Sequence, residues 1–160
     1  MFSSIFSGKR NIEDSLVGFE DVLGFISRIE NQSQKSTTTT TTTTTKTHLL
    51  INTLTVNEQQ TLIKCTLLET AEEKTINQFI DDYDMDDVQI ILYGKNSADG
   101  SVWEKYRQLF KLGFREIYIY SGGLFEWLLL QETYGQSAFP TTAKCSDILY
   151  YRAPKRRPQN

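Results

Sequence analysis

A short polar loop, residues 94–100, lies between an apolar run and a helical pattern, and its residue types limit the chemistry it can carry out. A strand that passes through a tight, glycine-bearing loop into a helix aims backbone N–H groups at an anion or a reacting atom. Group transfer at such a loop also needs a nucleophile activated by a base. The loop has no Cys, His or Arg, and Ser97 and the following Ser101 have no partner base in view. Lys95 favours weak anion binding there and Asp99 opposes it.

The other residues with nucleophilic or metal-binding side chains are Cys65, Cys145 and His48. The two cysteines are far apart, form no CxxC motif, and cannot complete a zinc set with a single histidine. We expect Cys65 to be a small buried apolar residue. The acidic run at residues 81–87 lacks the glycine and the distal Glu of a calcium loop, which favours a solvated turn. We therefore predict neither a metal nor a cofactor.

Strand and helix patterns alternate on both sides of the loop. Val88–Tyr93 is apolar except for Gln89, which is typical of a strand buried on both faces of a parallel sheet. This alternation predicts an α/β fold with a mostly parallel central sheet flanked by helices. Further strands are predicted at residues 48–54, 62–66 and 117–120. Helices are predicted to start at the capping box Thr70–Glu73, at Ser101 as N-cap, and near Leu124. Gly113 is predicted to end the second of these helices as a left-handed C-cap.

The N-terminal part predicts a helix and a linker. Apolar residues recur every three or four positions from Ile12 to Ile29, which indicates an amphipathic helix in residues 1–30. Residues 31–46 include nine consecutive threonines, and a polar homopolymer cannot offset the entropy of ordering, so this segment is predicted to be a disordered linker. The helix docks on its own domain, on a second copy or on another molecule, and the sequence leaves these alternatives open.

Residues 136–160 are predicted to be a C-terminal extension of the domain formed by residues 47–135. Three successive leucines, 128–130, put apolar atoms on more than one face of the last helix. Either the segment 139–151, the N-terminal helix or a partner covers them. The basic tail at residues 152–160 is predicted either to be solvated, to contact acidic protein, RNA or a nuclear import receptor, or to fold back on the acidic body.

Charge is unevenly distributed along the chain. The formal net charge is −3, yet residues 48–149 carry 8 Lys and Arg against 15 Asp and Glu. An acidic body disfavours nucleic acid, so the basic tail is the one segment predicted to be able to contact it. No apolar run reaches the roughly 18 residues of a membrane span, and the first residues lack the apolar core of a secretory signal. We expect a cytoplasmic chain with a protein partner and no membrane span.

Three motifs resemble a rhodanese-like domain. The first is the strand-loop-helix of residues 90–114, and the second is the LGF-x-x-x-Y-x-Y spacer of residues 112–120. The third is the pattern GF-x-x-V-x-x-L-x-GG-x-x-x-W, reproduced by Gly113, Phe114, Gly122, Gly123 and Trp127. The resemblance spans about residues 47–134 and implies a rhodanese-like α/β fold.

The resemblance also implies that the usual chemistry of the family is missing. In active members a Cys opens the loop and carries sulfur as a persulfide, and an Arg stands near the loop's end. The Cys position is Gly94 here, and the Arg position is Asp99 or Gly100. We therefore predict an inactive module for protein binding or scaffolding, which meets its partner through the loop or the apolar surface near residues 124–130. The alternative is a sulfurtransferase or phosphatase-like enzyme that uses a thiol elsewhere in the chain. The predicted binding residues are Gly94, Lys95, Asn96, Ser97, Ala98, Asp99, Gly100 and Ser101.

Overall fold

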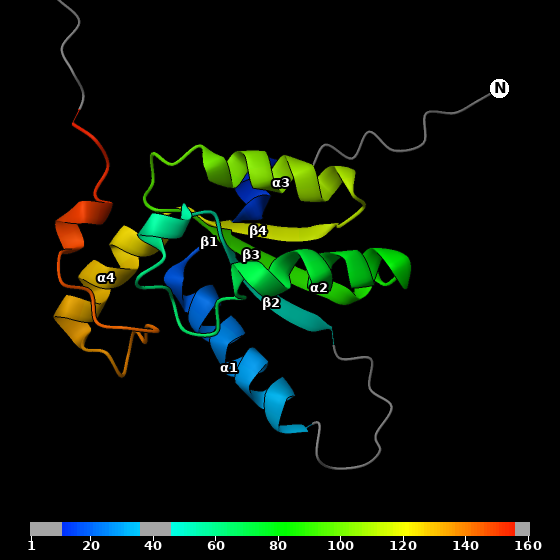
Figure 1. Ribbon diagram of the computed structural model, residues 1–160, viewed down its shortest axis with the longest axis horizontal. Coiled ribbons are helices and arrows are strands. Elements are labelled where there is room, and N and C mark those ends of the chain that lie inside the picture. The colour runs from blue at the N-terminus through cyan, green and yellow to red at the C-terminus, as the bar shows by residue number, and fades with distance from the viewer. Residues whose placement is uncertain (1–10, 36–45, 156–160) are drawn as a thin grey trace, which may run out of the picture.

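The computed structural model describes residues 11–35 and 46–155, in which four parallel strands form one sheet (Figure 1). All three strand pairings are parallel, so the carboxyl ends of the strands lie along the same edge of the sheet. The predicted α/β class with a parallel sheet is confirmed. In their order across the sheet the strands are β1 (Leu16–Val17), β4 (Glu116–Tyr120), β3 (Val88–Tyr93) and β2 (Thr47–Asn52).

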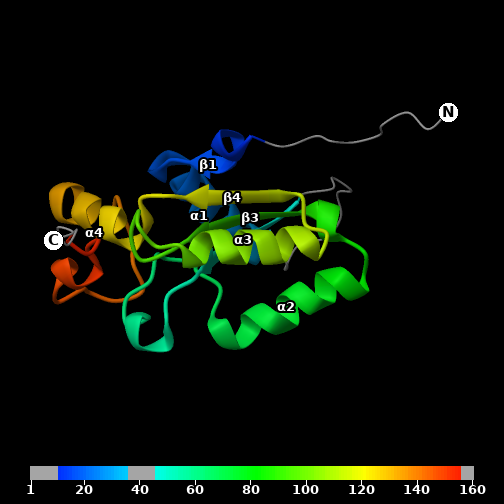
Figure 2. The ribbon, with the colours of Figure 1, turned by 90° about the horizontal axis from the view of Figure 1, so that it is seen from above.

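Helices cover both faces of the sheet, and in Figure 2 the sheet lies between α3 in front and α1 behind. One core joins α1 and α4 to strand residues such as Leu50 and Ile91. The other joins α2 and α3 to the alternate strand residues, such as Ile90 and Leu92. Because successive strand side chains point to opposite faces, the apolar run of β3 serves both cores. The helices are α1 (Phe19–Lys35), α2 (Glu69–Asp81), α3 (Ser101–Lys111) and α4 (Gly123–Tyr134), with 3-10 turns at Ile12–Ser15, Val56–Glu58, Met85–Asp87 and Ile148–Tyr151.

The N-terminal segment differs from the predicted single helix. The first residues that the structure describes form the 3-10 turn Ile12–Ser15 and then β1, which pairs with β4. Gly18 separates this strand from α1, which begins at Phe19 and continues to Lys35. The helical spacing of apolar residues gave a wrong prediction here, because Leu16 was counted among the buried residues of a helix. It is instead a strand residue and 41% exposed. Residues 31–35, predicted to be linker, are helical, and residues 36–45 with the first ten residues lie outside the described part of the chain.

Helix α1 packs on its own domain. Val22, Phe25 and Ile26 are buried in the core that contains β2 and β3. At the far end of the helix, His48 Nδ1 accepts a hydrogen bond from Gln32 Nε2 (3.1 Å), and the Phe25 ring meets the His48 ring edge to face. Of the alternatives that the sequence left open, the structure places the helix in cis, as part of the same core.

His48 gives the α1–β2 contact a predicted pH dependence. Burial and the nearby Arg28 lower the pKa of His48 below its usual 6.5. The unfolded chain therefore takes up the proton first as the pH falls, and folding stability decreases as the pH falls through about 6.5 toward the lower pKa of the folded chain. Urea unfolding across this pH range should show the decrease in the parent chain, whereas a His48→Gln variant, with no histidine left, should show a smaller one. Equal decreases in both proteins would contradict the assignment.

Two predicted elements were wrong. Residues 62–66 form no strand, because in this segment only Ile63 and Thr66 make isolated bridges, to Thr141 and Leu50. The predicted capping box at Thr70 lies inside α2, whose N-cap is Leu68 without a side-chain cap. A capping box does occur at Thr55, where Glu58 closes the short 3-10 turn. Sequence spacing alone did not distinguish the S/T-x-x-E pattern at Thr55, which forms a capping box, from the one at Thr70, which does not.

The C-terminal segment covers the apolar side of α4 (Figure 1). Phe139 and Tyr151 are buried in the same core as Trp127, whose indole N–H donates to the Pro140 carbonyl (3.2 Å). The Phe19 ring of α1 also meets Phe139 edge to face, so both intramolecular candidates contribute to the cover. Of the three leucines, Leu128 is buried and Leu129 is 45% exposed.

Candidate functional site

The loop at residues 94–100 lies at the carboxyl edge of the sheet, where β3 leads to α3 on one face and the neighbouring β4 leads to α4 on the other. In open α/β sheets ligands bind outside the carboxyl ends of the strands at such a reversal of direction. The fold therefore puts the predicted loop at the position where a ligand site is expected.

The carboxylate of Asp99 fills the inside of this loop. Its Oδ2 accepts from the backbone N–H of Lys95 (2.9 Å), and its Oδ1 accepts from the backbone N–H of Ser101 (3.0 Å) and from Ser101 Oγ (2.6 Å). An anion held by the loop would need these same donors. The expectation that Ser101 is the N-cap was wrong: Gly100 is the N-cap, and Asp99 supplies the acceptor for the first turn of α3.

Gly94, the first residue of the loop, has no room for a side chain. A Cβ atom there would lie 2.6 Å from Asp99 Oδ2 and 2.6 Å from Val102 Cγ2. Ordinary carbon contacts are about 3.5 to 4.0 Å, so any larger residue would displace one of these groups. The loop therefore has no nucleophile at position 94 and no space for one.

The N-terminus of α4 closes the other side of the loop. Leu124 N–H donates to the Gly94 carbonyl (2.9 Å) and Phe125 N–H donates to the Lys95 carbonyl (3.0 Å). Gly123 has φ +65°, and a Cβ there would lie 2.7 Å from the Gly94 carbonyl oxygen. The Gly122–Gly123 turn of the sequence motif thus lets α4 approach closely, and its first N–H groups bind the loop rather than a ligand.

The side chains of Asn96 and Lys95 are also engaged. Asn96 is buried, donates to the Tyr151 carbonyl (2.9 Å) and accepts from Ala98 N–H (2.9 Å). Lys95 Nζ lies 2.7 Å from Glu58 Oε1 and 4.6 Å from the centre of the Tyr150 ring. The hydrogen bond from Lys95 lowers the pKa of Glu58. The structure therefore brings the predicted residues together, but their contacts are with one another and with the chain.

The two thiols lie in other surroundings. Cys65 has φ +66° and is half-buried, and burial together with the nearby Glu30 raises the pKa of its thiol. Cys145 lies with Thr61 and Tyr151 in the wall of a separate cavity. A raised thiol pKa disfavours the reactive thiolate. Cys65 therefore fits the expected structural role better than a catalytic one.

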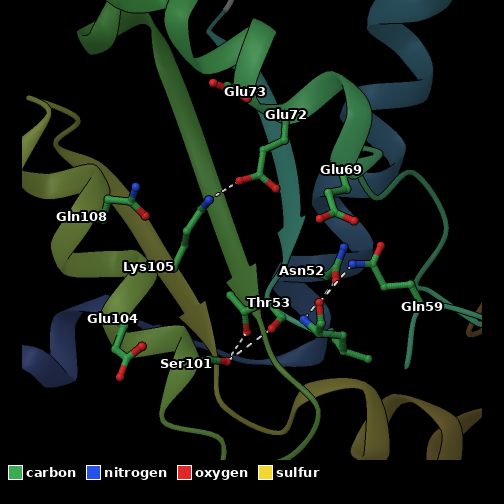
Figure 3. Close-up of a pocket in the computed structure, with 11 residues that line it drawn as sticks. Asn52, Thr53, Gln59, Glu69, Glu72, Glu73, Ser101, Glu104, Lys105 and Gln108 are labelled. Carbon is green, nitrogen blue, oxygen red and sulfur yellow. Dashed lines mark hydrogen bonds and ion pairs between the residues drawn. The ribbon is translucent and has the colours of Figure 1, made fainter. Parts of the chain in front are cut away.

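A polar cleft of about 440 Å³ between α2 and α3, called here the α2–α3 cleft, was missed by sequence analysis (Figure 3). Ser101 Oγ and Thr53 Oγ1 hydrogen bond (2.8 Å) at its α3 side, and the Lys105 ammonium pairs with Glu72 between the two helices. Three acids lie in the first turns of α2, at Glu69, Glu72 and Glu73, and the sequence pattern indicated only a capping box at Thr70–Glu73. The spacing of the acids on α2 could have indicated an acidic surface. No sequence pattern indicated that Asn52 and Glu104 lie beside these acids in the same cleft.

Comparison of the chain with protein-family models, with curated proteins and with solved structures finds no match. Within the described residues, no group of three or more His, Cys, Asp or Glu side chains is arranged to hold a metal ion. None of the helices described here combines the length and hydropathy that crossing a bilayer requires. The case for a function therefore comes from the loop and the cleft.

Asp99→Ala is expected to destabilise the domain by about 2 to 3 kcal/mol, because three donors to one carboxylate lose their acceptor together. Asp99→Asn keeps one carbonyl oxygen and should lose less. Chemical denaturation of both variants beside the parent chain measures the difference. Equal stability of Asp99→Ala and the parent would show that the carboxylate does not hold the loop.

Proposed function

We propose that the chain is a catalytically inactive rhodanese-like module that acts in protein binding or as a scaffold. The parallel α/β fold, with a glycine-bearing loop between β3 and α3, is consistent with the resemblance. Two free cysteines fit a reducing compartment such as the cytoplasm.

The observation that carries the proposal is the position of Asp99 within its own loop. The carboxylate uses the backbone N–H groups of Lys95 and Ser101, and it stands beside the spot where a Cβ at position 94 would lie. A negative charge there also repels the anionic sulfur and phosphorus substrates that such loops bind. Recognition of a partner requires none of these groups to be free.

The surface available to a partner differs from the one the sequence suggested. Only Ser97, Ala98 and Gly100 of the loop are exposed. Most of the leucine-rich surface of α4 is buried by the C-terminal segment and α1. A partner therefore meets the rim of the loop and the surfaces around it rather than an open active site.

The proposal is tested by assaying purified full-length chain for thiosulfate:cyanide sulfurtransfer and for phosphatase activity. A variant with both Cys65→Ala and Cys145→Ala serves as the thiol-free control. We expect both proteins to match the uncatalysed rate. Turnover that disappears in the thiol-free variant would establish the alternative enzyme, and turnover that persists in it would reveal another nucleophile; either result overturns the proposal.

A further inference from the structure

The α2–α3 cleft carries an excess of negative charge. Four carboxylates line it, from Glu69, Glu72 and Glu73 of α2 and Glu104 of α3, against one ammonium from Lys105. Lys105 pairs with Glu72, whereas Glu69, Glu73 and Glu104 form no ion pair with any other described residue. Carboxylates gathered around a partly enclosed cavity favour a cation.

Asn52 adds a hydrogen-bond donor to this cleft. The residue is only 6% exposed, and its Oδ1 is fixed by the backbone N–H of Leu54 (3.1 Å). This bond points the Nδ2 group into the cleft, where no acceptor among the described residues meets it (Figure 3). The neighbouring Leu54 carbonyl is already used by Gln59 Nε2 (3.0 Å). The Nδ2 group is therefore reached from the open cleft, where a ligand can supply the acceptor that solvent otherwise provides.

A ligand that suits both features offers a cation together with a neutral acceptor. An arginine residue within a peptide does so, because its guanidinium pairs with carboxylates through two N–H groups and its backbone carbonyl accepts from an amide. A cavity of about 440 Å³ has the size of an ordinary ligand site. Phosphate-bearing partners do not suit it, since the carboxylates repel them.

We propose that the α2–α3 cleft binds an arginine-bearing basic segment of a protein partner. The guanidinium lies among the carboxylates of Glu69 and Glu104, and the backbone of the segment accepts a hydrogen bond from Asn52. This inference rests on the proposed function and names the kind of partner that the module recognises.

The test titrates full-length chain into a fluorescein-labelled peptide of alternating glycine and arginine, followed by fluorescence anisotropy at low and physiological salt. A peptide with citrulline in place of arginine has nearly the same shape without the charge. We expect saturable binding of the arginine peptide that weakens with salt, and at least about tenfold weaker binding of the citrulline peptide. No saturation up to about 1 mM of the chain, or equal binding of the two peptides, would overturn the inference.

Matched variants separate the cleft from the general acidity of the chain. Glu69→Gln with Glu104→Gln removes two charges from the cleft, and Asp84→Asn with Asp86→Asn removes two exposed charges beyond the other end of α2. We expect about tenfold loss of affinity in the first variant and less than about twofold in the second. Equal losses would mean that the peptide senses only net charge, which overturns the cleft assignment.

The Asn52 side-chain amide provides a direct readout, since its pair of signals in a ¹H–¹⁵N NMR spectrum should shift on addition of the arginine peptide. Unchanged Asn52 signals at saturation would overturn the inference.

A chain lacking residues 155–160 should bind with unchanged affinity. Tighter binding would assign the cleft to the chain's own basic tail and overturn the assignment to a partner. The turnover assay tests the proposed function separately, because catalysis would refute the inactive module whatever the peptide does.

Discussion

A chain lacking residues 1–46 is expected to lose its cooperative unfolding transition. The deletion removes β1 from the edge of the sheet and takes Val22, Phe25 and Ile26 out of the core. Burying a side chain of this size contributes about 1.5 to 3 kcal/mol, so three together contribute about 4.5 to 9 kcal/mol. This is comparable to the whole stability of a typical domain, about 5 to 15 kcal/mol.

Thermal unfolding followed by circular dichroism measures this effect, together with binding of a dye that senses exposed apolar surface. We expect a broad or absent transition and increased dye binding in the truncated chain. Deleting residues 1–10 is the matched control, since it leaves every described contact in place. A sharp transition of the truncated chain close to that of the parent would show that the helix is a separable appendage on a linker.

The centre of the fold was predictable from sequence because its signals are local. The apolar run at Val88–Tyr93 can be buried only between two layers, and the structure places it as β3 with these bounds. The helix end at Gly113 was equally clear, because a glycine after an amphipathic helix fits the left-handed conformation, and its φ is +111°. In both cases one short stretch of chain decides its own structure.

The N-terminal segment could not be predicted in this way because its structure depends on a distant strand. Leu16 and Val17 are extended because they pair with Ile119 and Tyr120, about a hundred residues further along the chain. Helical spacing of apolar residues describes only the segment itself, so it continued the helix through Gly18 to Ile12. The short edge strand is thus a tertiary feature that overrides a local pattern.

The candidate site shows the same division between local and distant information. The missing Cys and Arg were evident from residue types, and so was the opposing charge of Asp99. That Asp99 turns into its own loop, and that α4 caps the carbonyls of Gly94 and Lys95, depends on how two loops meet at the carboxyl edge. The α2–α3 cleft likewise joins residues from β2, α2 and α3. Sequence therefore shows which residue types the loop lacks, but not that Asp99 and α4 occupy its backbone groups.

Placing a cysteine in the loop by Gly94→Cys is expected to destabilise the domain by about 2 to 4 kcal/mol without creating sulfurtransfer activity. The new Cβ would overlap Asp99 Oδ2 and Val102 Cγ2, each 2.6 Å away. Overpacking a filled site costs about 1 to 3 kcal/mol, and moving Asp99 also weakens its hydrogen bonds to Lys95 and Ser101. A carboxylate beside the thiol would in addition raise the thiol pKa and disfavour the thiolate that accepts sulfur.

Gly100→Cys is the matched control, because it places the same side chain in the same loop where a Cβ meets nothing within 4 Å. It should unfold like the parent chain in urea. Adding Asp99→Gly to Gly94→Cys should recover part of the lost stability, although loss of the Asp99 carboxylate alone destabilises the loop. This non-additivity is expected of two groups that compete for one space. If Gly94→Cys were as stable as the parent, the inside of the loop would have room for a side chain, and the Asp99 carboxylate would not fill it.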